Sequence, residues 1–292
     1  MPIRKILYPT KFRDLSFHSL LEFLELKKIG LEEIILLHII PREEVSFVPF
    51  GGYLKDKAIE LKEAAILKFK DWAKELHKES VKTKIYVEIG EVVGKILEVL
   101  EKEEPDLLII GKKKTIYPWT ASYSKEIIKN SPIPVVLYRR LVIKELEELC
   151  IQRENIKIFR KPLLAYDFSK EIKRTILYLL NFKDLIEQVS IIHVLEEKKL
   201  KDHSEEKIMK IEKEVEENLI KEKKIWDDLD IYCDYFIRIG NPAEEILELA
   251  REKQNTLIVL GKSSKGILSQ VFLGSVSAVL IEESEIPLLI VP

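Results

Sequence analysis

Three segments in the second half of the chain carry residue types suited to binding a phosphorylated ligand. One contains Asp167, another contains His193-Val194, and the third runs from Gly261 through Gly266 to Gly274-Ser275. Glycines allow positive φ and a close approach of the backbone to a ligand. A helix that begins after Gly274 would attract an anion with its free amides and its dipole. The third segment therefore predicts a phosphate site; the alternative is that its glycines only shape a turn.

Hydroxyl groups in the same segment could add hydrogen-bond donors, from Ser264, Ser275 and Ser277. Asp167 could act as a base, but a lone carboxylate beside a ligand more often accepts from a hydroxyl or an amine. The chain has no G-x-x-x-x-G-K-[ST], no G-x-G-x-x-G after its first strand and no G-x-S-x-G. These absences argue against a P-loop hydrolase, a dinucleotide enzyme and a serine hydrolase. An efficient enzyme is not expected, and slow ATP hydrolysis stays open.

The two halves of the chain share segments in the same order. Tyr86–Gly90 resembles Phe236–Gly240, and the apolar runs that end at Gly111 and Gly261 also match, each pair being separated by 150 residues. Matched segments in a constant order indicate a duplication. We expect one domain at 1–139, a linker at 140–156 that could form a short helix, and a second domain at 157–292.

Within each half, short apolar runs alternate with amphipathic segments. Runs such as Ile34–Ile40 suit parallel strands that are covered on both faces. Leu54–Lys78 and Ser204–Asp227 predict long surface helices, and Asn241-Pro242 is a favourable helix start. The order β-α-β-α-β-α-β-α-β with right-handed crossovers predicts the α/β class, as two doubly wound, five-stranded and mostly parallel sheets in tandem.

Composition restricts the class of protein. The 292 residues carry a net charge of −2, which gives no attraction to nucleic acid or to an anionic membrane. No apolar run could span a bilayer, and residues 1–14 contain no signal-peptide core. Cys150 and Cys233 share no metal-binding motif. We expect a cytoplasmic protein without a structural metal or a disulfide framework.

Four motifs in the second half resemble the universal stress protein family, and the resemblance covers essentially the whole chain twice. Asp167 matches the family's Asp after the first strand, and Ile192-His193-Val194 matches its second strand. Gly240-Asn241-Pro242 matches its Gly-x-Pro, and the segment from Gly261 to Gly274 has the length of its Gly-rich loop. The family's second glycine is Ser264 here, where a Cβ could clash if the loop needs positive φ; Gly266 can relieve this.

The resemblance implies two Rossmann-like domains of the adenine nucleotide alpha hydrolase-like type, the second of which binds ATP or AMP, with Mg²⁺ or Mn²⁺ as a further candidate. Val194 would pair with adenine through its backbone, Asp167 would contact the adenosine, and the glycine loop would contact ribose and phosphates. A sensor or stress-response role follows. The expected nucleotide-binding residues are Ala165, Asp167, Val194, Gly261, Ser264, Gly266, Gly274, Ser275, Val276 and Ser277.

The first half departs from this pattern. Lys11 replaces the Asp, and the segment from Gly111 to Ala121 is three residues shorter than its counterpart. Pro118 and Trp119 would fill the space for phosphates. We expect a degenerate, empty site; the alternative is that Lys11 and the lysines at 112–114 bind a different anion.

The family commonly forms dimers through its fifth strands. The resemblance implies that Pro134–Tyr138 and Pro287–Pro292 could pair within this one chain, which would bury two edges, and that two chains could associate further. His38 and His193 are expected to be packed histidines bonded to a neighbouring loop rather than metal ligands. A structural or interaction module without any ligand remains the rival interpretation.

Overall fold

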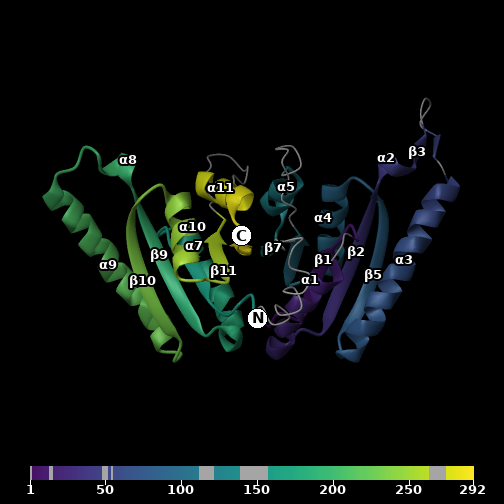
Figure 1. Ribbon diagram of the computed structural model, residues 1–292, viewed down its shortest axis with the longest axis horizontal. Helices are drawn as coiled ribbons and strands as arrows, with labels where there is room; N and C mark the ends of the chain where they lie inside the picture. Colours follow the sequence, from purple (N-terminus) through teal and green to yellow (C-terminus); the bar gives the residue numbers. More distant parts are fainter. Residues whose placement is uncertain are drawn as a thin grey trace, which may run out of the picture. The chain divides into compact units, whose positions relative to one another are not determined.

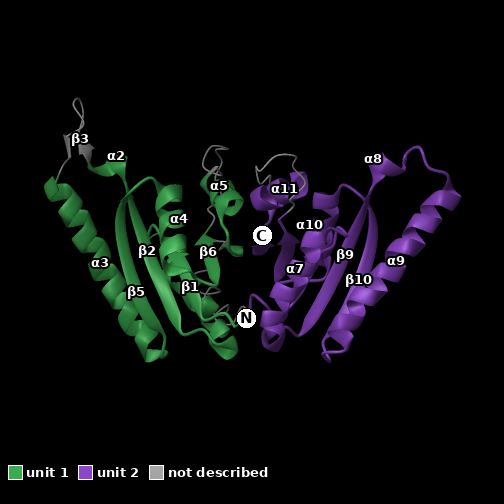
Figure 2. Ribbon diagram, turned by 180° about the vertical axis from the view of Figure 1, so that it is seen from behind, with its two compact units in different colours: residues 1–140 green, residues 141–292 purple. Residues whose placement is uncertain are grey.

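The computed structural model describes residues 2–12, 16–47, 52–53, 55–111, 122–138, 157–262 and 274–292. The chain divides into two units, residues 1–140 and 141–292 (Figure 2). The predicted linker at 140–156 and Cys150 lie outside the described residues. No helix among the described residues is long and apolar enough to cross a membrane.

The first unit contains a parallel five-stranded sheet with the strand order β7-β6-β1-β2-β5. A short antiparallel pair, β3 with β4, is an addition that the sequence did not predict. The elements, most of which are labelled in Figure 1, are β1 (Lys5–Pro9), α1 (Ser16–Glu22), η1 (Phe23–Ile29), β2 (Glu33–Pro41), α2 (Arg42–Val45), β3 (Ser46–Phe47), β4 (Gly52–Tyr53), α3 (Lys55–Lys78), β5 (Lys82–Gly90), α4 (Val92–Glu103), β6 (Leu107–Gly111), α5 (Ser122–Asn130) and β7 (Val135–Tyr138).

The second unit repeats this topology, with the order β10-β9-β8-β11-β12 and parallel pairing throughout. Its elements are β8 (Pro162–Ala165), α7 (Lys170–Leu179), η3 (Leu180–Leu185), β9 (Gln188–Glu196), α8 (Glu197–Leu200), α9 (Glu205–Asp227), β10 (Tyr232–Gly240), α10 (Pro242–Glu252), β11 (Leu257–Gly261), α11 (Ser275–Glu283) and β12 (Leu288–Val291). The predicted fold class is confirmed for both halves.

Local sequence explains where the helices begin and which face they bury. Asn241 caps α10, with its side chain accepting from the amide of Ala243 at 3.1 Å, and Pro242 occupies the first turn. In α4 the cap is Glu91, which accepts from the amides of Val93 and Gly94. Both helices bury an apolar stripe against the sheet.

The doubly wound connection places ligand-competent loops at one edge of each sheet. In the second unit the chain passes from β8 to β9 and β10, then returns to the other side of β8 for β11 and β12. The strand order thus reverses beside β8. In open α/β sheets, ligands bind at the carboxyl ends of the strands near such a reversal.

Candidate functional site

The loop after β8 positions Asp167 by a tight turn. Asp167 Oδ1 accepts from the amide of Ser169 at 3.0 Å, and Phe168 between them adopts a left-handed φ of 57°. Ser169 is the cap residue of α7. Asp167 is exposed, so its second carboxylate oxygen, Oδ2, can accept a hydrogen bond from a ligand.

Tyr166 and His193 hold this loop on the sheet. The amide of Tyr166 donates to Ile192 O at 2.8 Å, and His193 Nδ1 bonds to Tyr166 O at 2.7 Å. The Tyr166 hydroxyl donates to Glu222 on α9 at 2.7 Å, and burial together with this carboxylate raises the pKa of Tyr166. The ring of Phe168 lies 4.6 Å from that of His193 and remains 40% exposed. Both ends of the loop are therefore fixed before a ligand arrives.

The register of the sheet brings Val194 and Gly261 to the height of this loop. Leu164 in β8 pairs with Ile191 in β9 on one side and with Val259 in β11 on the other. Val194 lies three residues beyond Ile191, as Asp167 lies three beyond Leu164. Gly261, two residues beyond Val259, ends β11 beside them.

The backbone of Val194 is directed toward the space above the Asp167 loop. In a parallel ladder the bonding direction alternates along the strand. Ile192 faces β8, since its carbonyl accepts from Tyr166, and Val194 therefore faces the same side. The last β8 residue in the ladder is Ala165, paired with Ile192, so Val194 extends past the end of β8. Its N–H and C=O form a donor and acceptor pair at the sheet edge.

Packing leaves little room for a side chain at position 261. A Cβ at this position would lie 3.0 Å from Thr175 Oγ1 on α7, whereas a Cβ at Gly111, the equivalent in the first unit, would meet nothing within 4 Å. Gly261 is a strand residue paired with Val291, and among the described glycines only Gly30 has positive φ. The close approach of its backbone to a ligand stays a prediction.

The N-terminus of α11 is formed as predicted. Gly274 is the cap residue, with extended backbone, and Ser275 opens the helix. Ser275 is exposed and Val276 is half-buried, whereas Ser277 is only 8% exposed. Ser277 can therefore contribute its amide more readily than its hydroxyl. Ser264 and Gly266 lie outside the described residues.

Aromatic rings surround the corresponding loop of the first unit. The ring centre of Phe12, a residue with φ 51°, lies 4.6 Å from those of both His38 and Phe69 and 5.5 Å from that of Trp72. The Lys68 ammonium lies 5.2 Å from the centre of the Phe12 ring. The backbone bonds and the contact between phenylalanine and histidine match the second unit, but Lys223 stands in the place of Phe69.

Charge at this edge is reversed between the units. Lys11 occupies the place of Asp167, and its ammonium lies 5.7 Å from the Tyr123 ring. Lys68 occupies the place of Glu222, four residues before the tryptophan of each long helix. The lysines at 112–114, Pro118, Trp119 and Ala121 lie outside the described residues.

A sequence profile of the Universal stress protein family matches residues 2–139 and again residues 159–292. The chain belongs to the universal stress protein family. The double match confirms the duplication and the family resemblance expected from the sequence.

Individual relatives support the same assignment. Universal stress protein MJ0577 of Methanocaldococcus jannaschii is 27% identical over 154 residues, which are 46% of this chain and 95% of that protein. A universal stress protein from Archaeoglobus fulgidus has a crystal structure that covers 99% of this chain and 96% of its own, with 21% identity and a TM-score of 0.73. The latter likeness shows that both halves together share a known fold.

The two packed histidines of this universal stress protein are confirmed. His38 Nδ1 bonds to Thr10 O at 2.8 Å, as His193 bonds to Tyr166. Burial is the main cause that lowers the pKa of both imidazoles from 6.5. Around His38, Lys68 and Lys11 also lower the pKa, whereas the Thr10 carbonyl and Glu44 oppose this.

We expect stability to fall as the pH drops below about 6.5. The unfolded chain takes up protons there while the folded imidazoles stay neutral, so protonation favours the unfolded state. Each histidine contributes at most about 1.4 kcal/mol per pH unit. Urea unfolding between about pH 5.5 and 7.5 measures the slope. The double variant His38→Asn/His193→Asn should flatten it, and an unchanged slope would contradict this origin.

Two features of the site were missed from the sequence. The hydrogen bond from Tyr166 to Glu222 joins residues 56 positions apart, and no local pattern marks it. The left-handed residues Phe12 and Phe168 were also missed. The sequence did contain a signal for a turn at these positions. A phenylalanine follows the first strand in both repeats, and in the second repeat it lies within Asp-x-Ser, a pattern that favours a turn.

Proposed function

We propose that the second repeat binds an adenine nucleotide, ATP or AMP, at the carboxyl edge of β8, β9 and β11. The main support for this proposal is the position of Val194. Its backbone extends past the end of β8 and presents an N–H donor and a C=O acceptor at the height of Asp167. An adenine base presents one acceptor and one donor along its edge, so a single residue's N–H and C=O can pair with it.

Asp167 and the start of α11 complete the proposed contacts. A carboxylate accepts from the ribose hydroxyls or the base amine, and Asp167 is exposed at the loop that His193 supports. The amides after Gly274 suit phosphate oxygens, because the first turn of a helix has no internal acceptors for them. Ala165, Gly261, Ser275, Val276 and Ser277 belong to the same edge, and Ser264 and Gly266 are included from the sequence.

Nucleotide binding is tested first by what the purified protein carries. Acid extraction followed by chromatography should release ATP or AMP, and calorimetric titration of the stripped protein should give saturable binding of one of them. If neither nucleotide co-purifies and neither binds at millimolar concentration, the proposal is wrong and a ligand-free interaction module is favoured.

A cation would reach the site with the nucleotide. Among the described residues, no group of three or more His, Cys, Asp or Glu is placed to hold a metal ion. We therefore expect Mg²⁺ or Mn²⁺ to strengthen ATP binding more than AMP binding, since the triphosphate supplies the oxygens that these ions prefer. Titrations with and without each ion measure this, and phosphate release in the same samples reports any slow hydrolysis.

Replacing Asp167 by alanine should weaken nucleotide binding by about 1–3 kcal/mol, or roughly 5-fold to 150-fold in Kd. The reason is the loss of a charged acceptor from a loop whose backbone is otherwise held by His193. Calorimetry of Asp167→Ala beside Lys11→Ala, its matched variant in the first repeat, gives the comparison. Equal affinities for Asp167→Ala and the unaltered chain would contradict the role of Asp167.

The remaining parts of the proposal rest on the family. We propose a sensor or stress-response role in the cytoplasm, a first repeat without nucleotide, and pairing of the strands at Pro134–Tyr138 and Pro287–Pro292 within the chain. Lys11 in the place of Asp167 and the shorter segment from Gly111 to Ala121 support the second point. Sedimentation of the full chain with and without nucleotide measures whether two chains also associate.

A further inference from the structure

The interface between the outermost strand and the following helix has opposite charges in the two repeats. Each pair of equivalent positions is separated by 150 residues, and all four pairs differ in sign. The strand pairs are Lys84 with Asp234 and Glu88 with Arg238, and the helix pairs are Lys102 with Glu252 and Glu103 with Lys253.

The structure confirms that these positions are equivalent. Lys84 in β5 pairs with Ile35 in β2, and Asp234 in β10 pairs with Ser190 in β9. Ile35 and Ser190 each precede the packed histidine of their strand by three residues. The helices α4 and α10 begin at matching cap residues, Glu91 and Asn241, so their last turns correspond as well.

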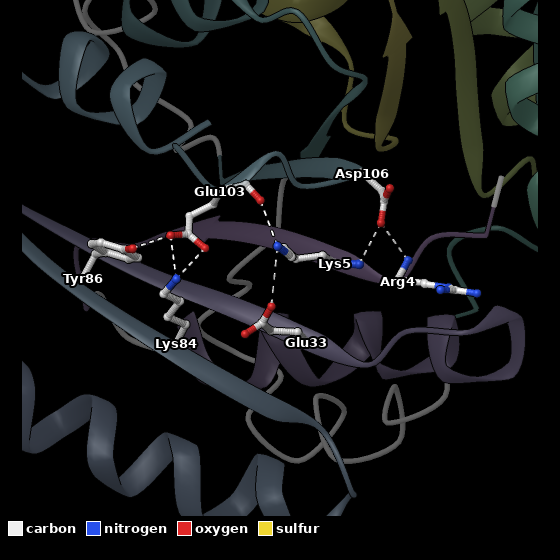
Figure 3. A network of polar contacts seen from close by, with 7 residues as sticks. All are labelled: Arg4, Lys5, Glu33, Lys84, Tyr86, Glu103 and Asp106. Atoms are coloured by element: carbon white, nitrogen blue, oxygen red, sulfur yellow. Dashed lines mark hydrogen bonds and ion pairs between the residues drawn. The ribbon is translucent and has the colours of Figure 1, made fainter. Parts of the chain in front are cut away.

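In the first repeat the helix supplies a buried carboxylate to a cation on the strand (Figure 3). Lys84 Nζ lies 2.7 Å and 2.8 Å from the two oxygens of Glu103, whose side chain is 5% exposed. The Tyr86 hydroxyl also donates to Glu103, and Lys5 Nζ donates to its carbonyl at 2.9 Å. Burial would raise the pKa of Glu103, but the hydrogen bonds from Lys84 and Tyr86 outweigh burial and lower it.

In the second repeat the strand again supplies the cation and the helix the carboxylate, but at different positions along the strand and the helix. Arg238 on the strand binds Glu252 at the end of α10, with Nη2 and Oε2 2.6 Å apart. Phe236 replaces Tyr86, and the ammonium of Lys253 lies 4.5 Å from the centre of its ring. The first repeat has a similar contact, with the Lys102 ammonium 4.9 Å from the centre of the Tyr86 ring, but there the ring also carries the hydroxyl that donates to Glu103.

Packing alone distinguishes the two helices only by size. Their buried stripes include Val93, Ile96 and Leu100 in α4 and Ala243, Ile246 and Ala250 in α10. All are apolar and the central position is isoleucine in both, but α4 carries the larger side chain at the other two positions. A helix on the wrong sheet would leave a gap or overfill the space there, yet hydrophobic contact has no direction that would forbid the docking.

We propose that the reversed charges prevent α4 and α10 from docking on each other's sheets while the chain folds. With α4 on the second sheet, Glu103 would lie beside Asp234 and would lose the hydroxyl donor that Tyr86 supplies, because Phe236 has none. With α10 on the first sheet, Lys253 would lie beside Lys84. Misassembly between repeats is a typical failure of tandem proteins, and like charges placed together strongly disfavour the wrong pairing.

The test transfers the charges of the second repeat into the first. The variant Lys84→Asp/Glu88→Arg/Lys102→Glu/Glu103→Lys keeps opposite charges facing each other inside the first repeat but makes the two helices interchangeable in charge. After dilution from urea, we expect a several-fold lower yield of native protein than the unaltered chain gives. Because Glu103→Lys also removes the acceptor of Tyr86 and lowers the urea midpoint, the refolding yield is the readout that tests the proposal.

The matched control reverses both repeats. Adding Asp234→Lys/Arg238→Glu/Glu252→Lys/Lys253→Glu restores the difference between the repeats, so the refolding yield should recover. An unchanged yield in the first variant would overturn the proposal. So would a yield that stays low when both repeats are reversed, because the charges would then matter only within their own repeat. If the first variant fails to fold at all, the doubly reversed chain decides in the same way.

Discussion

Replacing Trp226 by alanine is expected to lower the free energy of unfolding of the second unit by about 3–5 kcal/mol. Trp226 is 0% exposed in the last turn of α9, and it heads the largest fully buried side chains of the described residues. Its removal takes the most apolar contact out of the core and leaves a cavity that a helix fixed on β10 and β9 cannot close. Urea unfolding followed by circular dichroism measures the loss, and segment-resolved hydrogen exchange assigns it to the second unit.

Two companion variants separate packing from other causes. Trp226→Phe should cost much less, since Nε1 of Trp226 is buried without a hydrogen-bond partner in the described part of the chain. Trp72→Ala changes the equivalent residue of α3, which is only half-buried beside Phe12 and Phe17, and should also cost less. If Trp72→Ala destabilised the chain more than Trp226→Ala, burial would not be the deciding factor.

Glu103→Ala should destabilise the first unit by about 2–3 kcal/mol. Removing one partner of a fully buried ion pair costs about 3–5 kcal/mol. The expected loss is smaller here because the side chain of Lys84 is 47% exposed, so its ammonium can be solvated by water. The remaining cost comes from the Tyr86 hydroxyl, which loses its acceptor. The urea midpoint of the first unit, resolved by hydrogen exchange, is the measurement.

The charge of Glu103 gives this prediction a pH signature. The pKa of Glu103 is lowered from 4.5 in the folded state, so its contribution is complete above about pH 4.5 and is lost as the pH falls through the folded pKa. The difference between the unaltered chain and Glu103→Gln should therefore shrink under acid. A difference that is independent of pH would mean that shape, not charge, is lost.

The fold was predictable because its signals are local and repeated. The apolar runs, the Asn241-Pro242 helix start and the order of matched segments each depend on residues close in sequence. The packed histidines were predictable for the same reason, since a lone His at a buried strand end needs a neighbouring acceptor. Two copies of each pattern made the interpretation firmer than one copy would have done.

What the sequence did not reveal depends on register and long-range approach. The Lys84–Glu103 pair needs β5 and α4 in their final alignment, and the Tyr166–Glu222 bond needs α9 packed on the sheet. The tight space around Gly261 likewise depends on Thr175, which is far away in the sequence. The nucleotide contacts stay a prediction.

The reversed charges also limit how the gene can change. A crossover between the two coding halves that falls between Glu88 and Lys102 would join the strand of one repeat to the helix of the other. The hybrid would place Lys84 with Lys253 and Glu88 with Glu252, so the product loses both ion pairs in one event. A crossover outside this segment moves strand and helix together and keeps the pairs. Of the exchanges between the halves, those whose breakpoints leave strand and helix united are therefore the ones that preserve these ion pairs.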